Sequence, residues 1–148
     1  MKWVTRRGIR VNRAATAWLI RRFIDRDATL RFVDPGEVAT IQWREGAKGF
    51  DAPEAMYPHQ DAQSRCSFEA LVAEHCADDA ALVALARIVR GADFRDQIDS
   101  TPESAGLRAM SHGFPLVVCD DHETVEKASF LYDALYAFPS EQKGEGRR

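Results

Sequence analysis

The chain has 148 residues, 45% of them hydrophobic and 29% charged, and its formal net charge is −3. This length suits one globular domain and is short for two, and the near-neutral charge excludes a uniformly basic, histone-like protein. No apolar run approaches the roughly 20 residues of a membrane-spanning helix, and the first residues lack the apolar stretch of a secretion signal. The three cysteines (Cys66, Cys76, Cys119) form no Cys-x-x-Cys pair, which is typical of a reducing compartment. We therefore expect a cytoplasmic protein without a membrane partner.

The net charge hides an uneven distribution along the chain. Residues 1–31, the basic head, carry nine basic and two acidic side chains, a net charge of +7. The remaining residues, the acidic body, carry 11 basic and 21 acidic side chains, a net charge of −10. A function for this protein has to account for that basic head.

The first part of the sequence predicts two strands with a helix between them. Residues 1–5 are rich in aromatic and β-branched side chains, and residues 29–33 alternate between apolar and polar before a Pro-Gly turn. Between them, Asn12 is a suitable N-cap for an amphipathic helix over residues 13–25. Residues 37–43 fit either a short helix followed by a strand or an extended segment.

Glycine and proline interrupt any regular period between residues 45 and 63. This stretch is predicted to be a loop, and its length is typical of functional loops. Beyond it, Ser67 is a suitable cap for a helix with one apolar face. A second amphipathic helix begins at Asp78 or Asp79 and is expected to end at Gly91, just after basic residues in its last turn.

Two further helices are predicted in the last third of the chain. Thr101, followed by proline, caps a helix that runs to about Gly113. Asp120 begins a capping box at the start of a final amphipathic helix, which Pro139 is expected to end.

Together these elements predict an α+β fold. Residues 1–138 form one compact, mostly helical domain with a small N-terminal β-sheet, and residues 139–148 form a polar tail that we expect to be disordered. The sequence contains no internal repeat and no linker between domains.

The basic head offers a site for a small oxyanion. Arg6 follows the first strand and Arg13 begins the next helix, where free backbone N–H groups around Asn12 favour an anion. Arginine binds oxyanions through paired donors. Alternatively, these arginines pair with the acidic body and hold the domain together. A third interpretation is DNA contact, but no zinc finger or helix-turn-helix pattern accompanies the head, so the sequence disfavours DNA binding by this chain alone.

A second candidate site consists of residues that can ligate a metal. His59 lies in the irregular loop, eight residues after Asp51 and seven before Cys66, and these three residue types bind divalent transition metals. The spacing matches no established metal motif, so a surface histidine, a turn-capping aspartate and a cysteine beside a helix are the alternative. Asp93 lies in an acidic turn between two helices, where carboxylates act as metal ligands, acid–base groups or helix caps.

Several stretches together resemble the C-terminal domain of the chromate-resistance protein ChrB, in order from residue 2 to residue 138. The most specific stretch is residues 18–25, WLIRRFID. The other matching stretches are residues 2–6, 12–13, 50–51, 66–69, 88–93 and 132–136 and the loop around His59. The family's Cys-Pro pair ahead of the tryptophan is Thr16-Ala17 here, so a thiol is absent at that place.

The resemblance implies a role in chromate resistance, as a sensor, regulator or handler of the oxyanion. It marks particular positions as functional. These are Arg6, Arg13 and Arg21 as basic residues, His59 and Cys66 as a loop pair, and Asp93 as their acidic partner.

The leading hypothesis is therefore that Arg6, Arg13 and Asn12 bind a small oxyanion and that His59 bridges or coordinates it. The runner-up is an enzyme of undefined reaction whose divalent transition metal is held by the His59 loop and Asp93. A DNA-binding regulator ranks third. The sequence is compatible with a homodimer and leaves open whether the protein is an enzyme.

Overall fold

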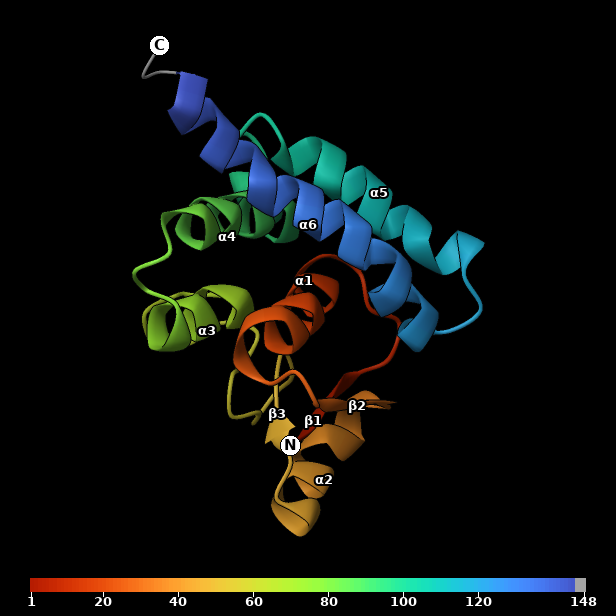
Figure 1. Ribbon diagram of the computed structural model, residues 1–148. Helices are drawn as coiled ribbons and strands as arrows, with labels where there is room; N and C mark the ends of the chain where they lie inside the picture. Colours follow the sequence, from red (N-terminus) through yellow and green to blue (C-terminus); the bar gives the residue numbers. More distant parts are fainter. Residues whose placement is uncertain (146–148) are drawn as a thin grey trace.

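A small parallel sheet lies at one end of the molecule (Figure 1). The computed structural model describes residues 1–145, with side chains as far as Phe138. The strands are β1 (Lys2–Arg6), β2 (Thr29–Val33) and β3 (Lys48–Gly49), in the order β2-β1-β3. Strand β1 is central, and both of its pairings are parallel. Parallel strands need a long crossover connection, usually a helix. Here the helical residues 11–24 connect β1 to β2, and the helical residues 35–45 connect β2 to β3.

Helix α1 is the centre of the helical layer. It spans Val11–Leu19 and continues as a π-helical turn, η1 (Ile20–Ile24), before β2. Helices α3 (Ser67–His75), α4 (Ala80–Asp93) and α6 (Asp121–Glu145) pack around α1, and α5 (Ser104–Val117) packs mainly on α4. The main core lies between these helices and one face of the sheet. Its largest members are Trp3, Trp18, Phe50, Phe68 and Tyr132.

The other face of the sheet is covered by one short helix. A 3-10 turn, η2 (Pro35–Glu37), leads into α2 (Val38–Glu45), which settles the ambiguous segment as a helix rather than a strand. Val4, Val33 and Val38 form a second, smaller core between α2 and the sheet. The predicted α+β fold, mostly helical with a small N-terminal sheet, is confirmed.

Three predicted helix starts, those of α1, α3 and α5, are displaced by one or two residues; α5 begins at Ser104, with Glu103 rather than Thr101 at its cap position. Asn12 is not an N-cap, because α1 begins at Val11 and Asn12 lies inside its first turn. The Asn12 amide is buried: its Nδ2 donates to the Ser67 Oγ (2.8 Å) and its Oδ1 accepts from the Phe68 N–H (3.2 Å). Ser67 is likewise the first residue of α3, and Cys66 is its cap. The Asn12 side chain, which the local sequence pattern predicted to cap α1, instead forms hydrogen bonds between α1 and α3.

Three predicted helix ends are too early. Helix α4 runs through Gly91 to Asp93. A side chain at Gly91 would collide with Ser104 of α5, so this glycine allows close packing of the two helices and does not end α4. Helix α5 begins at Ser104 and continues past Gly113 to Val117. Helix α6 continues past Pro139 to Glu145. Of the predicted tail, residues 146–148 lie outside the described residues.

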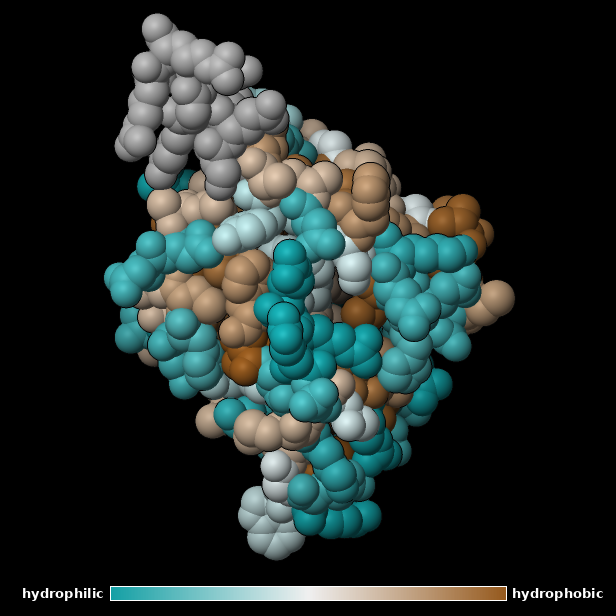
Figure 2. Space-filling model, in the orientation of Figure 1, coloured by the Kyte–Doolittle hydropathy of each residue, from teal (hydrophilic) through white to brown (hydrophobic). Residues whose placement is uncertain are grey.

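The surface is uneven in polarity. Met110, Leu116 and Val117 of α5 are exposed, and apolar colours gather over this helix in Figure 2, whereas hydrophilic side chains cover much of the rest of that face. Within residues 1–145, no helix has the length and apolar character needed to cross a bilayer.

Candidate functional site

The carboxyl ends of β1 and β3 bring a basic and an acidic residue together. Arg6 is the last residue of β1, and Asp51 follows β3 by two residues. The Phe50 N–H donates to the Val4 carbonyl (3.0 Å), so the chain stays bonded to β1 up to the residue before Asp51. Because carboxyl ends of parallel strands lie at one edge of a sheet, the topology places Asp51 beside Arg6.

Asp51 is the hub of a buried charge cluster. Its side chain is only 4% exposed, yet three cationic or ionisable groups surround it. Its Oδ1 lies 2.6 Å from the His59 Nδ1 and 3.5 Å from an Arg6 Nη2, and its Oδ2 lies 3.4 Å from the Arg13 Nε. The Arg6 Nε donates to the Asp51 carbonyl (2.7 Å). A buried carboxylate is tolerated only with such partners.

The backbone at Asp51 has a positive φ of 49°, a conformation that aspartate and asparagine adopt more readily than most residues. The Asp51 N–H donates to the Tyr57 carbonyl at 2.7 Å, which closes the loop between them. That closure carries the chain back so that His59 reaches the Asp51 carboxylate. The part of the irregular loop from Asp51 to His59 is thus a turn that hydrogen bonds to Asp51 close at both its backbone and its side chain.

The Arg13 guanidinium is mostly buried beside Asp51 and contacts backbone carbonyls. Its Nη1 donates to the carbonyls of Arg6 (3.0 Å) and Arg7 (2.9 Å), and its side chain is 16% exposed. Burial lowers the pKa of Arg13, although Asp51 opposes that shift. The guanidinium holds the connection between β1 and α1 in place.

Arg6 and His59 line one surface pocket of about 500 Å³, together with Ala52, Pro53, Pro58 and Gln60. The His59 ring is 49% exposed and packs edge-on against Phe94 at 5.4 Å between centroids. The hydrogen bond to Asp51 is the main reason that the pKa of His59 is raised. Because Nδ1 is committed to Asp51, Nε2 is the nitrogen left to contact a ligand.

Asp93 completes the cluster as the last residue of α4. Its Oδ2 lies 3.9 Å from the His59 Nδ1 and is buried without a hydrogen-bond partner among the described residues. Burial, followed by the neighbouring Asp51, raises the pKa of Asp93 to about 6. Arg6, Arg13, Asp51, His59 and Asp93, hereafter the Asp51 cluster, are thus brought together from β1, α1, the loop and α4.

Asp93 predicts a specific dependence of stability on pH. Its pKa is about 6 in the folded chain against an ordinary 3.8, so between these values the folded chain binds the extra proton. The free energy of unfolding should therefore fall by up to about 3 kcal/mol as pH rises from about 4 to about 6. The raised pKa of His59 acts in the same direction at higher pH.

Urea unfolding of the wild type and of Asp93→Asn across pH 4–8 measures this contribution. The difference in unfolding free energy between the two should grow in favour of the variant as pH rises through 4–6. Asp96→Asn, which changes an exposed carboxylate three residues away, is the control. Parallel curves for the wild type and Asp93→Asn would contradict the prediction.

Three of the predicted site residues, Asn12, Arg21 and Cys66, lie apart from the Asp51 cluster; the buried Asn12 amide is bonded to Ser67 and Phe68 of α3. Arg21 lies in η1, eight residues and about 12 Å along the helix from Arg13. Cys66 is buried, and its sulfur accepts the Glu69 N–H at the start of α3. Burial raises the pKa of the Cys66 thiol well above its usual value, which disfavours a thiolate. Within residues 1–145, no three or more His, Cys, Asp or Glu side chains form a group that could hold a metal ion.

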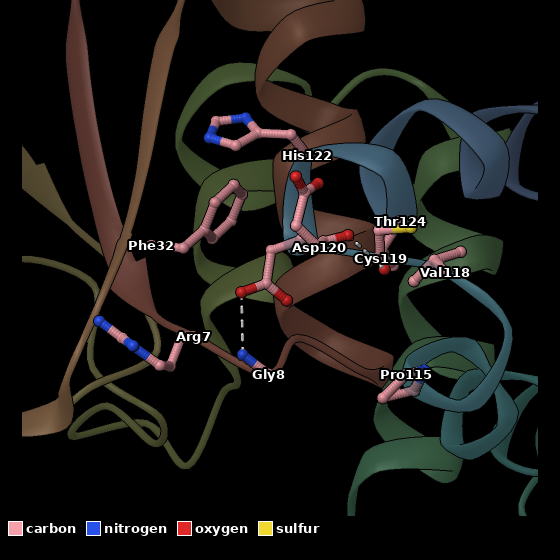
Figure 3. A pocket seen from close by; sticks show the side chains of 10 residues that line it. Arg7, Gly8, Phe32, Pro115, Val118, Cys119, Asp120, His122 and Thr124 are labelled. Carbon is pink, nitrogen blue, oxygen red and sulfur yellow. Dashed lines mark hydrogen bonds between the residues drawn. The ribbon is translucent and has the colours of Figure 1, made fainter.

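The backbone N–H groups of the turn before α1 bind a side chain of the protein itself. The N–H groups of Gly8 and Ile9 donate to the two carboxylate oxygens of Asp121, each at 2.9 Å. Figure 3 shows the Gly8 bond in a second pocket of about 420 Å³, where Phe32 and His122 face each other. Sequence reasoning missed Asp121; the glycine at position 8 was the available signal of a turn with exposed N–H groups, and in the structure its φ is 72°.

Other arginines of the basic head pair with the acidic body, as the alternative interpretation predicted. The Nε of Arg7 lies 2.9 Å from Asp34, and an Nη1 of Arg31 lies 2.7 Å from Glu45. The alternative interpretation of the basic head therefore holds for Arg7 and Arg31. Arg6 is the one that combines an internal ion pair with a place in the wall of the pocket.

The fold and site define a small α+β domain with a buried cluster of arginine, aspartate and histidine at the carboxyl edge of its sheet. The sequence matches the family described as ChrB, C-terminal domain, over residues 3–139, and the chain belongs to that family. Protein ChrB of Cupriavidus metallidurans is 33% identical over 146 residues, which cover 96% of this chain and 42% of that protein. The chain thus spans less than half the length of this relative. No solved structure matches this chain.

Proposed function

We propose that this chain is a chromate-resistance domain that binds a small oxyanion in the pocket between Arg6 and His59. The observation that supports it is that these two groups, both held by the buried Asp51, line the same pocket of about 500 Å³. The membership of the ChrB C-terminal family supports the same class of ligand. Arg13, which the sequence predicted as a direct ligand, takes a positioning role in this proposal.

The chemistry of the two groups suits a tetrahedral oxyanion. The Arg6 Nε donates to the Asp51 carbonyl and its Nη2 lies 3.5 Å from the Asp51 carboxylate, so the other N–H groups of the guanidinium are the ones that can point at a ligand. The raised pKa of His59 increases the imidazolium fraction near neutral pH, and its Nε2–H can then donate a charge-assisted hydrogen bond. Asp51 and Arg13 fix the positions of these donors before the anion arrives, which reduces the entropy cost of binding.

Calorimetric titration with chromate, sulfate and phosphate tests the proposal. Arg6→Gln is expected to weaken binding by about ten- to a hundredfold, because a charge-assisted contact is lost. Arg7→Gln is the matched control, since Arg7 is 61% exposed and paired with Asp34 outside the pocket. His59→Gln should also weaken binding. No binding by the wild type, or equal losses in Arg6→Gln and Arg7→Gln, would contradict the proposed function.

A further inference from the structure

One carboxylate oxygen beside the proposed anion pocket, the Oδ2 of Asp93, has no hydrogen-bond partner among the described residues. The His59 Nδ1 lies 2.6 Å from Asp51 and 3.9 Å from the Asp93 Oδ2, so its proton is shared with Asp51 and not with Asp93. The Asp93 Oδ2 is buried and accepts no hydrogen bond among the described residues. A buried charge left in this way is costly, and protein sites seldom retain one without a use.

We propose that Asp93 sets the charge selectivity of the pocket, as a fixed negative group behind His59 that disfavours dianions more strongly than monoanions. This inference rests on the proposed oxyanion function. It assigns Asp93 no direct contact with the ligand, which meets the exposed side of the imidazole and Arg6. Asp93 acts through its field at the pocket and through the imidazole that separates the two.

Charged groups from several elements face Asp93. Asp51 and His59 belong to the loop, Arg13 to α1 and Arg108 to α5, whose Nη1 donates to the Ala92 carbonyl at 3.1 Å. The charge of Asp93 also contributes to the raised pKa of two weakly acidic groups, the Cys66 thiol before α3 and the Tyr132 hydroxyl of α6. Burial raises the pKa of Asp93 to about 6, so its carboxylate is charged at pH 8 and neutral at pH 5. The selectivity is therefore present at pH 8 and absent at pH 5.

The expected effect of the Asp93 charge on anion affinity follows from Coulomb's law. An anion bonded to the His59 Nε2 lies within about 9 Å of the Asp93 carboxylate, given the 3.9 Å from that carboxylate to Nδ1 and an ordinary hydrogen-bond length. The repulsion is proportional to the charge of the ligand. If removing the Asp93 charge tightens a monoanion by a factor f, it tightens a dianion of the same shape by about f squared. With partial solvent screening, we expect roughly fivefold and roughly 25-fold.

Sulfate and perchlorate, two tetrahedral anions that do not titrate between pH 5 and 8, are the probes. Calorimetry at constant ionic strength compares the wild type, Asp93→Asn and the exposed control Asp96→Asn. At pH 8, Asp93→Asn should bind both anions more tightly, with the larger gain for sulfate, and Asp96→Asn should match the wild type. At pH 5, all three proteins should agree. Asp93→Ala replaces the asparagine variant if that variant does not fold.

The ratio of the two gains separates an electrostatic role from a structural one. A structural disturbance would change both affinities by a similar factor or weaken them, and either result would overturn the inference. Sulfate binding that is lost in Arg6→Gln and unchanged in Asp93→Asn would contradict this inference alone. No binding of either anion by the wild type would contradict the proposed function and this inference with it.

Discussion

Asp51→Asn is expected to lower the free energy of unfolding by about 3–5 kcal/mol, because removing one member of a buried ion cluster leaves its partners unpaired. Arg6, Arg13 and His59 all depend on this one carboxylate, whose side chain is 4% exposed. Asparagine tolerates the positive φ of 49° at this position, so the substitution tests the charge with little added backbone strain. Urea unfolding at pH 7 measures the loss.

The matched control for Asp51→Asn is Asp34→Asn. Asp34 also pairs with an arginine, at 2.9 Å, but both side chains are more than 60% exposed, and such a pair contributes less than about 1 kcal/mol. The pKa of His59, followed by NMR, should fall in Asp51→Asn, since the Asp51 hydrogen bond is the main cause of its elevation. Equal stabilities of the two variants, or an unchanged pKa of His59, would show that Asp51 is not the hub.

Trp18→Ala is expected to cost about 3–5 kcal/mol of unfolding free energy, because it leaves a large cavity in the core. Trp18 is 3% exposed and packs against Phe23 and Tyr132, with ring centroids 5.5 and 5.8 Å away. Its Nε1 donates to Asp133 at 2.9 Å. Trp18→Phe keeps most of the ring and loses this hydrogen bond, so it should cost less, about 1–2 kcal/mol. Urea unfolding followed by circular dichroism measures both.

Trp43→Ala provides the comparison for Trp18→Ala. Trp43 is 90% exposed on α2, so its removal should change the unfolding free energy by less than about 0.5 kcal/mol. The contrast tests whether Trp18 belongs to the core or offers a platform for stacking nucleic-acid bases. A Trp18→Ala variant as stable as Trp43→Ala would contradict the core assignment.

Helical periodicity predicted the number and position of the main helices well. The apolar stripes at i, i+3, i+4 and i+7 are properties of neighbouring residues, so they are visible without the fold. Asp79 is confirmed as the cap of α4, with its side chain accepting from the Ala81 and Leu82 N–H groups. The boundaries of other helices were less predictable, because Asn12 and Gly91 serve contacts with α3 and α5 rather than capping and termination.

Part of the candidate site could be named from residue chemistry, whereas the arrangement of its members could not. Arg6, Arg13, His59 and Asp93 were named for their chemistry; the fold places the first three against Asp51 and Asp93 beside His59. Asn12, Arg21 and Cys66 were named as well, and the fold leaves them outside this cluster. That Asp51 is a shared counter-ion rather than a peripheral turn residue could not be read from spacing, because residues 6, 51 and 93 meet only through the sheet and α4. The role of Asp121 at Gly8 and Ile9 was hidden for the same reason.

The sequence by itself determined the class of fold, the main amphipathic helices, the family and the concentration of positive charge in the first 31 residues. These are local or compositional properties, set by propensity, periodicity and residue type. Only the tertiary structure decided which arginines line the pocket beside His59 and which pair with acidic groups elsewhere. Arg7 and Arg31 pair with surface acids, Arg13 is buried against backbone carbonyls, and Arg6 alone of these lines the pocket with His59. That choice depends on which acidic groups packing brings within a few ångströms, and Coulomb interactions over such distances follow the fold, not the order of residues along the chain.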